Sequence, residues 1–417
     1  MLKQFFSFNY FYSFNFWISF AVCILLLRLV CRKKIIRDFT LLGTSILMLF
    51  ALPMFDVYVL LFYLLLSFFV FIMSRYLIKT DSRRRYLTIF ISTALVVCVL
   101  IYFKYSFLQI FIKNRILQGE TIVTHTIFIV GISYISFKEI HILIDSYNKK
   151  LKELDLLTYL NYIFFFPSFI SGPINRYEQF RNSYTDFDEN TIRGDLKSGS
   201  YRIVNGLFKK LVLAVIVFPY TFIHHGSESA GLSAGSFILA VYAQTLYFYF
   251  DFSGYSDMAI GCAQVLGIRL PENFNSPFTK PNLQQLWNNW HMSLTRWLFD
   301  YIYWPAVKRL RKNAYFKKKA LLLSNTGVLI TFLVCGIWHG EGINFVLWGL
   351  YHGIGLSVLK IFQYHIKRNN SGVITSIFNF RYINLISTCI TFNYFAFGMI
   401  LFSLDLRQIL QVIVRIF

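Results

Sequence analysis

The sequence lacks the short motifs that mark several common enzyme classes. It contains no Walker loop for nucleotide phosphates, no HExxH zinc motif and no GxGxxG dinucleotide motif, so nucleotide-binding and zinc-protease functions have no positive support. None of the six cysteines belongs to a CxxC pair, and all lie in or beside apolar segments. Neither a disulfide framework nor a zinc site is indicated.

Apolar side chains dominate what is present. The 417 residues are 56% hydrophobic and 19% aromatic, with a mean hydropathy of +0.53, whereas soluble domains average about 45–50% apolar residues. This excess predicts an all-α, polytopic membrane protein. Because a membrane-spanning helix needs about 20 mostly apolar residues, we expect about eleven spans, near residues 8–30, 39–53, 55–76, 87–103, 122–144, 156–173, 207–224, 234–250, 320–338, 343–363 and 384–404.

Basic residues cluster in the short polar stretches between the apolar segments. The net charge is +21, and runs of Lys and Arg occur at 31–37, 79–85, 148–152, 308–319 and 365–368. Cytoplasmic loops of membrane proteins are enriched in Lys and Arg, so we expect most of these runs in the cytoplasm and the N-terminus outside. Loops of this size meet anionic lipid headgroups, and we expect no nucleic-acid partner.

Two regions interrupt the succession of apolar segments. Residues 184–206 are the most polar part of the chain and are interpreted as a cytoplasmic loop leading into an amphipathic helix. Residues 251–319 are too polar to span a membrane, and four prolines and seven Asn or Gln side chains fall within 271–310. Such backbone persists at membrane depth only where it is buried in protein or lines an aqueous cavity, which predicts a re-entrant segment.

From Leu283 to Lys308 the pattern becomes helical. Apolar side chains recur at i, i+3 and i+4 spacing, which is typical of one helix face; they are Leu286, Trp290, Leu294, Trp297 and Leu298. Polar residues, among them His291, occupy other faces. We therefore expect a short amphipathic helix that lies in the membrane interface or dips into the protein.

Three histidines lie in or near apolar runs. His339 stands between Trp338 and Gly340, where an ionisable side chain is costly unless it faces a cavity or has a partner; packing near an interface is the alternative. His291 is interpreted either as a second polar group in the same cavity or as an interfacial side chain. His352, flanked by glycines that permit close helix approach, is interpreted as a packing or hydrogen-bonding residue.

An imidazole at such a position suits proton transfer at neutral pH. With an unperturbed pKa near 6.5 it can deprotonate a hydroxyl or protonate a leaving group. Asp251 and Asp257, among aromatic and small residues at 247–263, could tune such an imidazole or cap a loop end. Pairing with a Lys or Arg is the default expectation for carboxylates in these surroundings.

Six segments resemble, in the same order, motifs of the bacterial membrane-bound O-acyltransferases: residues 131–147, 165–180, 248–261, 270–278, 287–305 and 336–353. The resemblance covers roughly residues 100–355. It implies a helical funnel that meets a narrow tunnel across the bilayer, in the bacterial cytoplasmic (inner) membrane. We expect one membrane-embedded acyltransferase domain over 1–417, with N-terminal helices in 1–105 and C-terminal helices in 356–417.

The resemblance also implies roles for individual residues. His339, the histidine of the WHG motif, would be catalytic and act as general base on the acceptor hydroxyl. His291, the histidine of WHMSL, would lie along the same tunnel, where it positions the donor or shares the proton. Candidates for binding substrate or lining the tunnel are Asn289, Trp290, Ser293, Trp338, Asp257 and Asn273. No bound cofactor or metal is implied.

The implied reaction moves an acetyl or D-alanyl group from a cytoplasmic thioester, either acetyl-coenzyme A or an acyl or aminoacyl carrier protein. The acceptor would be a hydroxyl of an extracytoplasmic cell-envelope polysaccharide or teichoic acid, reached through an extracytoplasmic transferase or a small membrane peptide. FSGYSDMAIG resembles the polysaccharide-acetylating branch, whereas SGPINRY and WHMSL resemble the D-alanylating branch, so the acyl group stays open. A transporter or flippase for lipid-linked sugars and a non-catalytic scaffold are the alternatives, and neither depends on His339.

Overall fold

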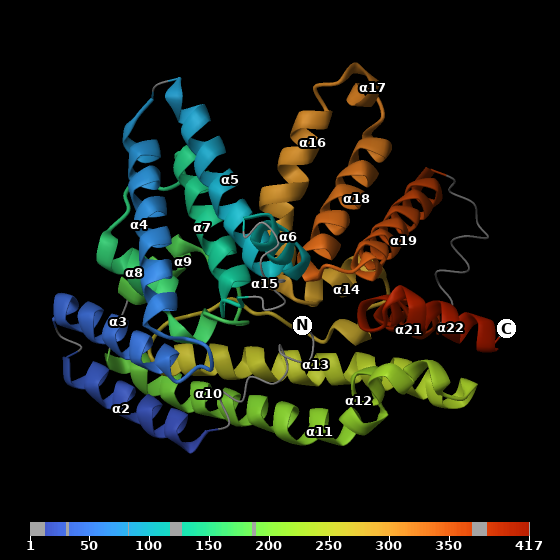
Figure 1. The fold of residues 1–417 in the computed structure, drawn as a ribbon, viewed down its shortest axis with the longest axis horizontal. Coiled ribbons are helices and arrows are strands. Elements are labelled where there is room, and N and C mark those ends of the chain that lie inside the picture. The colour runs from blue at the N-terminus through green and yellow to red at the C-terminus, as the bar shows by residue number, and fades with distance from the viewer. Residues whose placement is uncertain are drawn as a thin grey trace. The chain divides into compact units, whose positions relative to one another are not determined.

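The computed structural model describes residues 13–30, 33–81, 83–116, 127–185, 189–368 and 382–416. Throughout these ranges the regular structure is helical and contains no strand (Figure 1), which confirms the all-α prediction. The chain divides into two compact units, 1–206 with 255–271 and 207–254 with 272–417. Helices α10 (Glu189–Phe208) and α13 (Ala234–Val265) each continue across a boundary between these units. The single membrane-embedded domain stays a prediction.

The first unit is built around α7 (Ile132–Tyr147), which contacts α4 (Val57–Lys79) and α5 (Arg84–Lys104). Nearly all side chains of α7 are buried, including the charged ones. The remaining helices of this unit are α2 (Phe14–Val30), α3 (Lys34–Phe50), α4 (Val57–Lys79), α5 (Arg84–Lys104), α6 (Ser106–Ile116), α8 (Leu156–Phe164), α9 (Tyr177–Thr185), most of α10 and the end of α13.

Buried polar side chains of α7 are held by hydrogen bonds. Glu139 accepts from the hydroxyls of Ser67 at 2.8 Å and Tyr159 at 2.5 Å. The Lys138 ammonium donates to the carbonyl of Tyr162 at 2.9 Å and to the hydroxyl of Ser168 at 3.0 Å. Because the last carbonyls of a helix have no partner within it, Lys138 supplies partners for the end of α8. Pro167, two residues after the cap at Phe165, cannot continue that helix.

The prediction for 184–206 was a loop leading into an amphipathic helix. The loop part is wrong from residue 189 onward, because these residues already form α10. Tertiary packing stabilises this helix against the end of α13. The two backbones approach so closely that a Cβ on Gly199 would lie 2.9 Å from the carbonyl oxygen of Gly261. The Arg202 guanidinium pairs with the Asp257 carboxylate at 3.0 Å. Polar composition thus reflects cross-helix partners here, and the local pattern alone did not reveal them.

The second unit contains α18 (Ala320–His339) and α19 (Ile343–Arg368), joined by a short turn and in extensive contact. The short helix α17 (Ala314–Lys317) lies between the ends of α16 (Trp304–Leu310) and α18 (Figure 1). The other elements are the π-helix η3 (Lys209–Leu213), α11 (Ala214–Val217), α12 (Phe222–His225), the start of α13, α14 (Leu283–Asn289), α15 (Met292–Leu298), the π-helix η7 (Phe299–Tyr303), α16 (Trp304–Leu310), α21 (Ile383–Ser403) and α22 (Leu406–Ile416).

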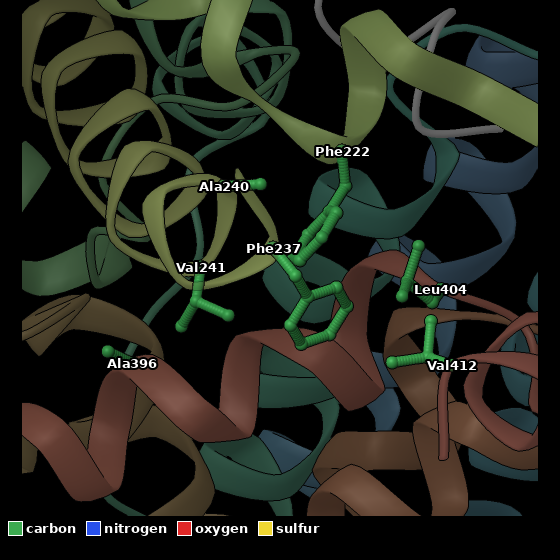
Figure 2. Packing of buried hydrophobic residues seen from close by; sticks show 7 residues of the cluster. All are labelled: Phe222, Phe237, Ala240, Val241, Ala396, Leu404 and Val412. Atoms are coloured by element: carbon green, nitrogen blue, oxygen red, sulfur yellow. The ribbon is translucent and has the colours of Figure 1, made fainter. Parts of the chain in front are cut away.

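A compact apolar cluster joins α12, α13, α21 and α22 within the second unit. The rings of Phe222 and Phe237 pack with centroids 5.2 Å apart. Figure 2 shows these two rings at the centre of the cluster, with Ala240, Val241 and Ala396 on one side and Leu404 and Val412 on the other. The cluster consists of Phe222, Phe237, Ala240, Val241, Ala396, Leu404 and Val412, and it anchors α22 to the body of the unit.

Six helices of the described chain are long and apolar enough to cross a membrane: Val57–Lys79, Arg84–Lys104, Asp195–Tyr220, Ala320–His339, Ile343–Ile366 and Ile383–Ser403. Each of them overlaps one of the predicted spans, and a shorter apolar helix at Phe14–Leu29 corresponds to the first.

The predicted count of about eleven spans is not confirmed by this set. The expected span at 156–173 is a nine-residue helix followed by a 3-10 turn, and α3 has 17 residues. Helix α13 has 32 residues, but polar side chains such as Gln244 and Asp251 recur along it. Part of the predicted span 122–144 lies outside the described residues.

Candidate active site

The predicted helix over 283–308 is wrong in its continuity. Helix α14 ends at Asn289, Trp290 is extended, and His291 adopts left-handed backbone angles (φ 42°, ψ 51°) before α15 begins at Met292. Left-handed backbone is uncommon for residues other than glycine. The predicted apolar stripe is confirmed as buried, with Leu286 fully covered. The segment therefore dips into the protein as two short helices with His291 at the break.

Asn273 holds the break from a neighbouring loop. Its side-chain oxygen accepts from the Ser293 hydroxyl at 2.8 Å and from the Ser293 N–H at 3.3 Å. The Asn273 backbone carbonyl accepts from the Met292 N–H at 2.9 Å. These groups provide partners for the first N–H groups of α15, which have none within the helix. Asn273 and Ser293 are both buried.

His291 itself is 5% exposed, so the alternative of an exposed interfacial side chain is wrong. Its ring packs edge-on against Phe252 with centroids 4.7 Å apart, and Nε2 has no hydrogen-bond partner among the described residues. Burial lowers the pKa of His291 to about 3, because desolvation disfavours the charged imidazolium. At neutral pH the ring is uncharged and presents one donor and one acceptor nitrogen.

His339 is the last residue of α18, and the chain turns at Gly340 in an extended conformation. The side chain is half-buried. Aromatic rings surround the imidazole at centroid distances of 4.7 Å for Trp338, 5.0 Å for Trp348 and 5.0 Å for Phe402. The imidazole therefore stands at a helix end, partly accessible, with apolar rings restricting its motion.

Glycines let α18 and α19 approach closely just before His339. A Cβ on Gly336 would lie 3.2 Å from the Gly349 Cα, and one on Gly349 would lie 3.3 Å from the Gly336 Cα. Small residues at helix crossings allow this approach of backbones in membrane proteins. Since Gly336 is three residues before His339, the crossing sets the position of His339 along α19.

His352 on α19 is fully buried inside an aromatic cluster. Its ring centroid lies 5.0 Å from both Trp287 and Trp348, and those two indoles are 5.8 Å apart. Within the described part of the chain, neither nitrogen of His352 and neither indole N–H has a hydrogen-bond partner. The packing interpretation of His352 is confirmed, and hydrogen bonding to the described residues is not observed.

Both acidic side chains singled out in the sequence form ion pairs. Asp251 on α13 pairs with Lys210 of the π-helix η3, and both are buried. Asp257 pairs with Arg202 inside the first unit. The default expectation of Lys or Arg pairing is therefore confirmed for both.

One further sequence pattern is structural. Residues 231–235 read GLSAG, a spacing shared with the nucleophile elbow of hydrolases. That elbow joins a strand to a helix, whereas Ser233 precedes α13 and accepts from the Ser236 N–H at 3.2 Å. Ser233 is thus a helix cap. Among the described residues no cluster of three or more His, Cys, Asp or Glu side chains is arranged to hold a metal.

The model of the MBOAT, membrane-bound O-acyltransferase family, matches residues 49–399. The chain belongs to this family.

Curated relatives of this membrane-bound O-acyltransferase fall into two groups. A protein named teichoic acid D-alanyltransferase from Bacillus subtilis is 30% identical over 275 residues, covering 66% of this chain and 68% of the relative. A probable alginate O-acetylase AlgI from Azotobacter vinelandii is 33% identical over 275 residues, covering 63% of this chain and 54% of the relative. A second teichoic acid D-alanyltransferase, from Streptococcus thermophilus, is 33% identical over 215 residues, covering 50% of this chain and 51% of the relative. The family and these names support an acyltransferase.

The structure of this acyltransferase places most of the predicted site residues in the second unit. His291, Asn273, Ser293, Trp290 and Asn289 surround the break between α14 and α15, and Trp338 and His339 end α18. Asp257 belongs to the first unit. The Asn289 side chain donates to the Gln285 carbonyl of its own helix at 2.8 Å.

A continuous series of ring contacts links the two histidines of the acyltransferase. Trp348 touches His339, Phe252 touches His291, and the rings between them follow at centroid distances of 4.8 to 5.8 Å; they are Trp287, Phe395, Trp290 and Phe274. The sequence-based predictions omitted Trp287, Trp348 and Phe395 as neighbours of the site. The density of aromatics between 287 and 348 was the signal that could have found two of them.

Proposed function

We propose that this membrane-bound O-acyltransferase transfers an acyl group from a cytoplasmic thioester to a hydroxyl of an extracytoplasmic envelope polymer, in the bacterial cytoplasmic membrane. The observation that carries the proposal is the placement of His339. It ends a candidate membrane span, is half-buried, and is joined through packed rings to the buried, uncharged His291. Family membership over residues 49–399 supports the reaction class.

In the proposed reaction, a nitrogen of His339 accepts the proton of the acceptor hydroxyl while the oxygen bonds to the thioester carbonyl carbon. The tetrahedral adduct then loses the thiolate as its carbon–sulfur bond breaks, and the imidazolium returns the proton to that sulfur. A new ester and a free thiol result. His291 lies further along the aromatic series, where its neutral ring positions the donor or shares the proton.

The acyl group is acetyl or D-alanyl. The names of the relatives include both an alginate O-acetylase and teichoic acid D-alanyltransferases, and the matched residues favour neither. The acceptor is accordingly a cell-envelope polysaccharide or a teichoic acid, and an extracytoplasmic transferase or small membrane peptide passes the group on.

The test uses cells that carry wild type, His339→Ala or His365→Ala, fed in parallel with radiolabelled acetate and D-alanine. His365 is an exposed histidine of α19 and serves as the matched control. We expect base-labile label in the envelope to disappear only in His339→Ala, and the label that disappears identifies the acyl group. Equal ester label in all three strains, with the variant present in the membrane, would refute the proposal and favour a transporter or scaffold.

The donor is proposed to be acetyl-coenzyme A or an acyl or aminoacyl carrier protein that docks on the basic stretch of α16 and α17. Lys308, Arg309, Arg311 and Lys312 are all exposed there, and both kinds of donor carry negative charge. Opposite charges accelerate encounter. Reversing these four charges should raise the KM for the donor and leave kcat unchanged, whereas reversing the exposed Lys33 and Lys34 should change neither KM nor kcat. An unchanged KM in the first variant would place docking elsewhere.

A further inference from the structure

We infer that Asn273 and Ser293 are positioning residues for His291: they hold the chain broken at His291 so that its imidazole faces Phe252 and the aromatic series. The inference rests on the proposed function, in which His291 serves the acyl-transfer site. It assigns to Asn273 and Ser293 a role that does not require contact with substrate.

The sequence on its own favours an unbroken helix here. The apolar stripe from Leu286 to Leu298 keeps helical spacing across the break, and neither glycine nor proline interrupts it. The observed left-handed His291, at φ 42°, must therefore be imposed from outside the segment. Continuing the helix would move His291 to the right-handed region and swing its ring away from its present direction.

The contacts that impose the left-handed conformation on His291 come from the loop that contains Asn273. Three hydrogen bonds join Asn273 to the first two residues of α15, two to its side-chain oxygen and one to its backbone carbonyl. A fourth bond, from the Asn275 N–H to the Asn289 carbonyl at 3.0 Å, holds the end of α14. The carbonyl of Asn289 would accept within a continuous helix, so this bond also opposes continuation.

Burial makes these contacts decisive. Asn273 is 0% exposed and Ser293 is 3% exposed, so water does not replace a lost partner. Removing one member of a buried pair leaves the other unsatisfied. The side-chain oxygen of Asn273 is the acceptor shared by two donors of Ser293, which makes it the most consequential single atom of the break.

The test compares Asn273→Ala and Ser293→Ala with the conservative Asn273→Asp, which retains the acceptor oxygen. Since a displacement near 1 Å at a reacting centre can cost about 100-fold in rate, we expect kcat to fall about 10- to 100-fold in Asn273→Ala, with Asn273→Asp recovering most of it. Asn288→Ala, an exposed amide of α14, is the control and should behave as wild type. In a His291→Ala background, Asn273→Ala should cause no further loss.

A second readout is independent of activity. Diethyl pyrocarbonate modifies accessible neutral imidazoles, and peptide mass spectrometry resolves the rate at each histidine of the purified protein in detergent. In Asn273→Ala and in the milder Ser293→Ala we expect faster modification of His291, with the buried His352 unchanged as an internal reference. Equal protection of His291 in wild type and both variants would overturn the inference.

The two failures are distinguishable. Full activity of His291→Ala would refute the proposed role of His291, while the modification rates would still decide whether Asn273 and Ser293 hold its ring. Modification of His291 and His352 together would indicate global loosening, and would overturn a selective role for Asn273 and Ser293.

Discussion

A Cβ placed on Gly349 tests how tightly the crossing of α18 and α19 fixes His339. In Gly349→Ala the new carbon would lie 3.1 Å from the carbonyl carbon of Phe332, closer still to its oxygen, and 3.3 Å from the Cα of Gly336. All three neighbours are backbone atoms of α18, so no side-chain rotation relieves the overlap. The two helices must separate.

The magnitude follows from a matched pair of variants. A Cβ added to Gly43, inside α3, would have no neighbour within 4 Å, so Gly43→Ala gains only the helix propensity of alanine, about 1 kcal/mol. Gly349→Ala shares that gain but adds overpacking, which costs about 1–3 kcal/mol. The difference in unfolding free energy between the variants isolates the crossing and should be about 1–3 kcal/mol.

The assay has two parts. Unfolding of each variant in mixed micelles, followed by tryptophan fluorescence, gives the stability difference. Base-labile ester formation gives the activity, which should fall in Gly349→Ala because separation of the helices shifts the end of α18 and the His339 imidazole. Equal stability and full activity of Gly349→Ala and Gly43→Ala would refute the argument that this crossing places His339.

Two further predictions concern buried charge and pH. Lys210→Met leaves the Asp251 carboxylate buried without its partner, which should cost about 3–5 kcal/mol of stability. Lys210→Met combined with Asp251→Leu should recover most of it; a double variant as unstable as the single one would contradict this account. Because burial lowers the pKa of His291 from 6.5 to about 3, the unfolded chain binds a proton between these values that the folded chain does not. The stability that neutral His291 contributes is therefore complete above pH 6.5. As the pH falls from 6.5 towards 3, it is lost at about 1.4 kcal/mol per pH unit. The unfolding free energy of wild type relative to His291→Gln, measured between pH 7 and 4.5, should decline accordingly, and a pH-independent difference would argue against the buried neutral ring.

Long apolar segments were predictable from sequence. The expected spans at 320–338 and 343–363 agree with the helices Ala320–His339 and Ile343–Ile366 to within a few residues, because hydropathy over about 20 residues depends little on tertiary contacts. The motif histidines were likewise identified by residue type and surroundings. His339 was expected beside Trp338 near the end of an apolar run, and the structure places it there.

Most features of the fold that were not predicted from the sequence depend on contacts between residues far apart in the chain. The break at His291 is caused by Asn273, eighteen positions away in the sequence, and periodicity within 283–308 carries no trace of it. The expected span at 156–173 stops early at Phe164 because Pro167 cannot continue the helix, a local signal that hydropathy does not register. The carbonyls of Tyr162 and Ile163 then accept from the distant Lys138. The first part of α10 was predicted to be a loop leading into a helix, because the partners that stabilise α10, Gly261 and Asp257, lie in another helix.

The concentration of indoles around the imidazoles has an optical consequence. Six of the seven tryptophans fall between Trp287 and Trp348, and the rings of Trp338 and Trp348 both contact His339. Indole emission is sensitive to the charge of an adjacent imidazole and to the polarity around it. The protein thus carries a built-in spectroscopic reporter, and a change of its intrinsic fluorescence on adding an acyl donor would reveal events at His339 without any label.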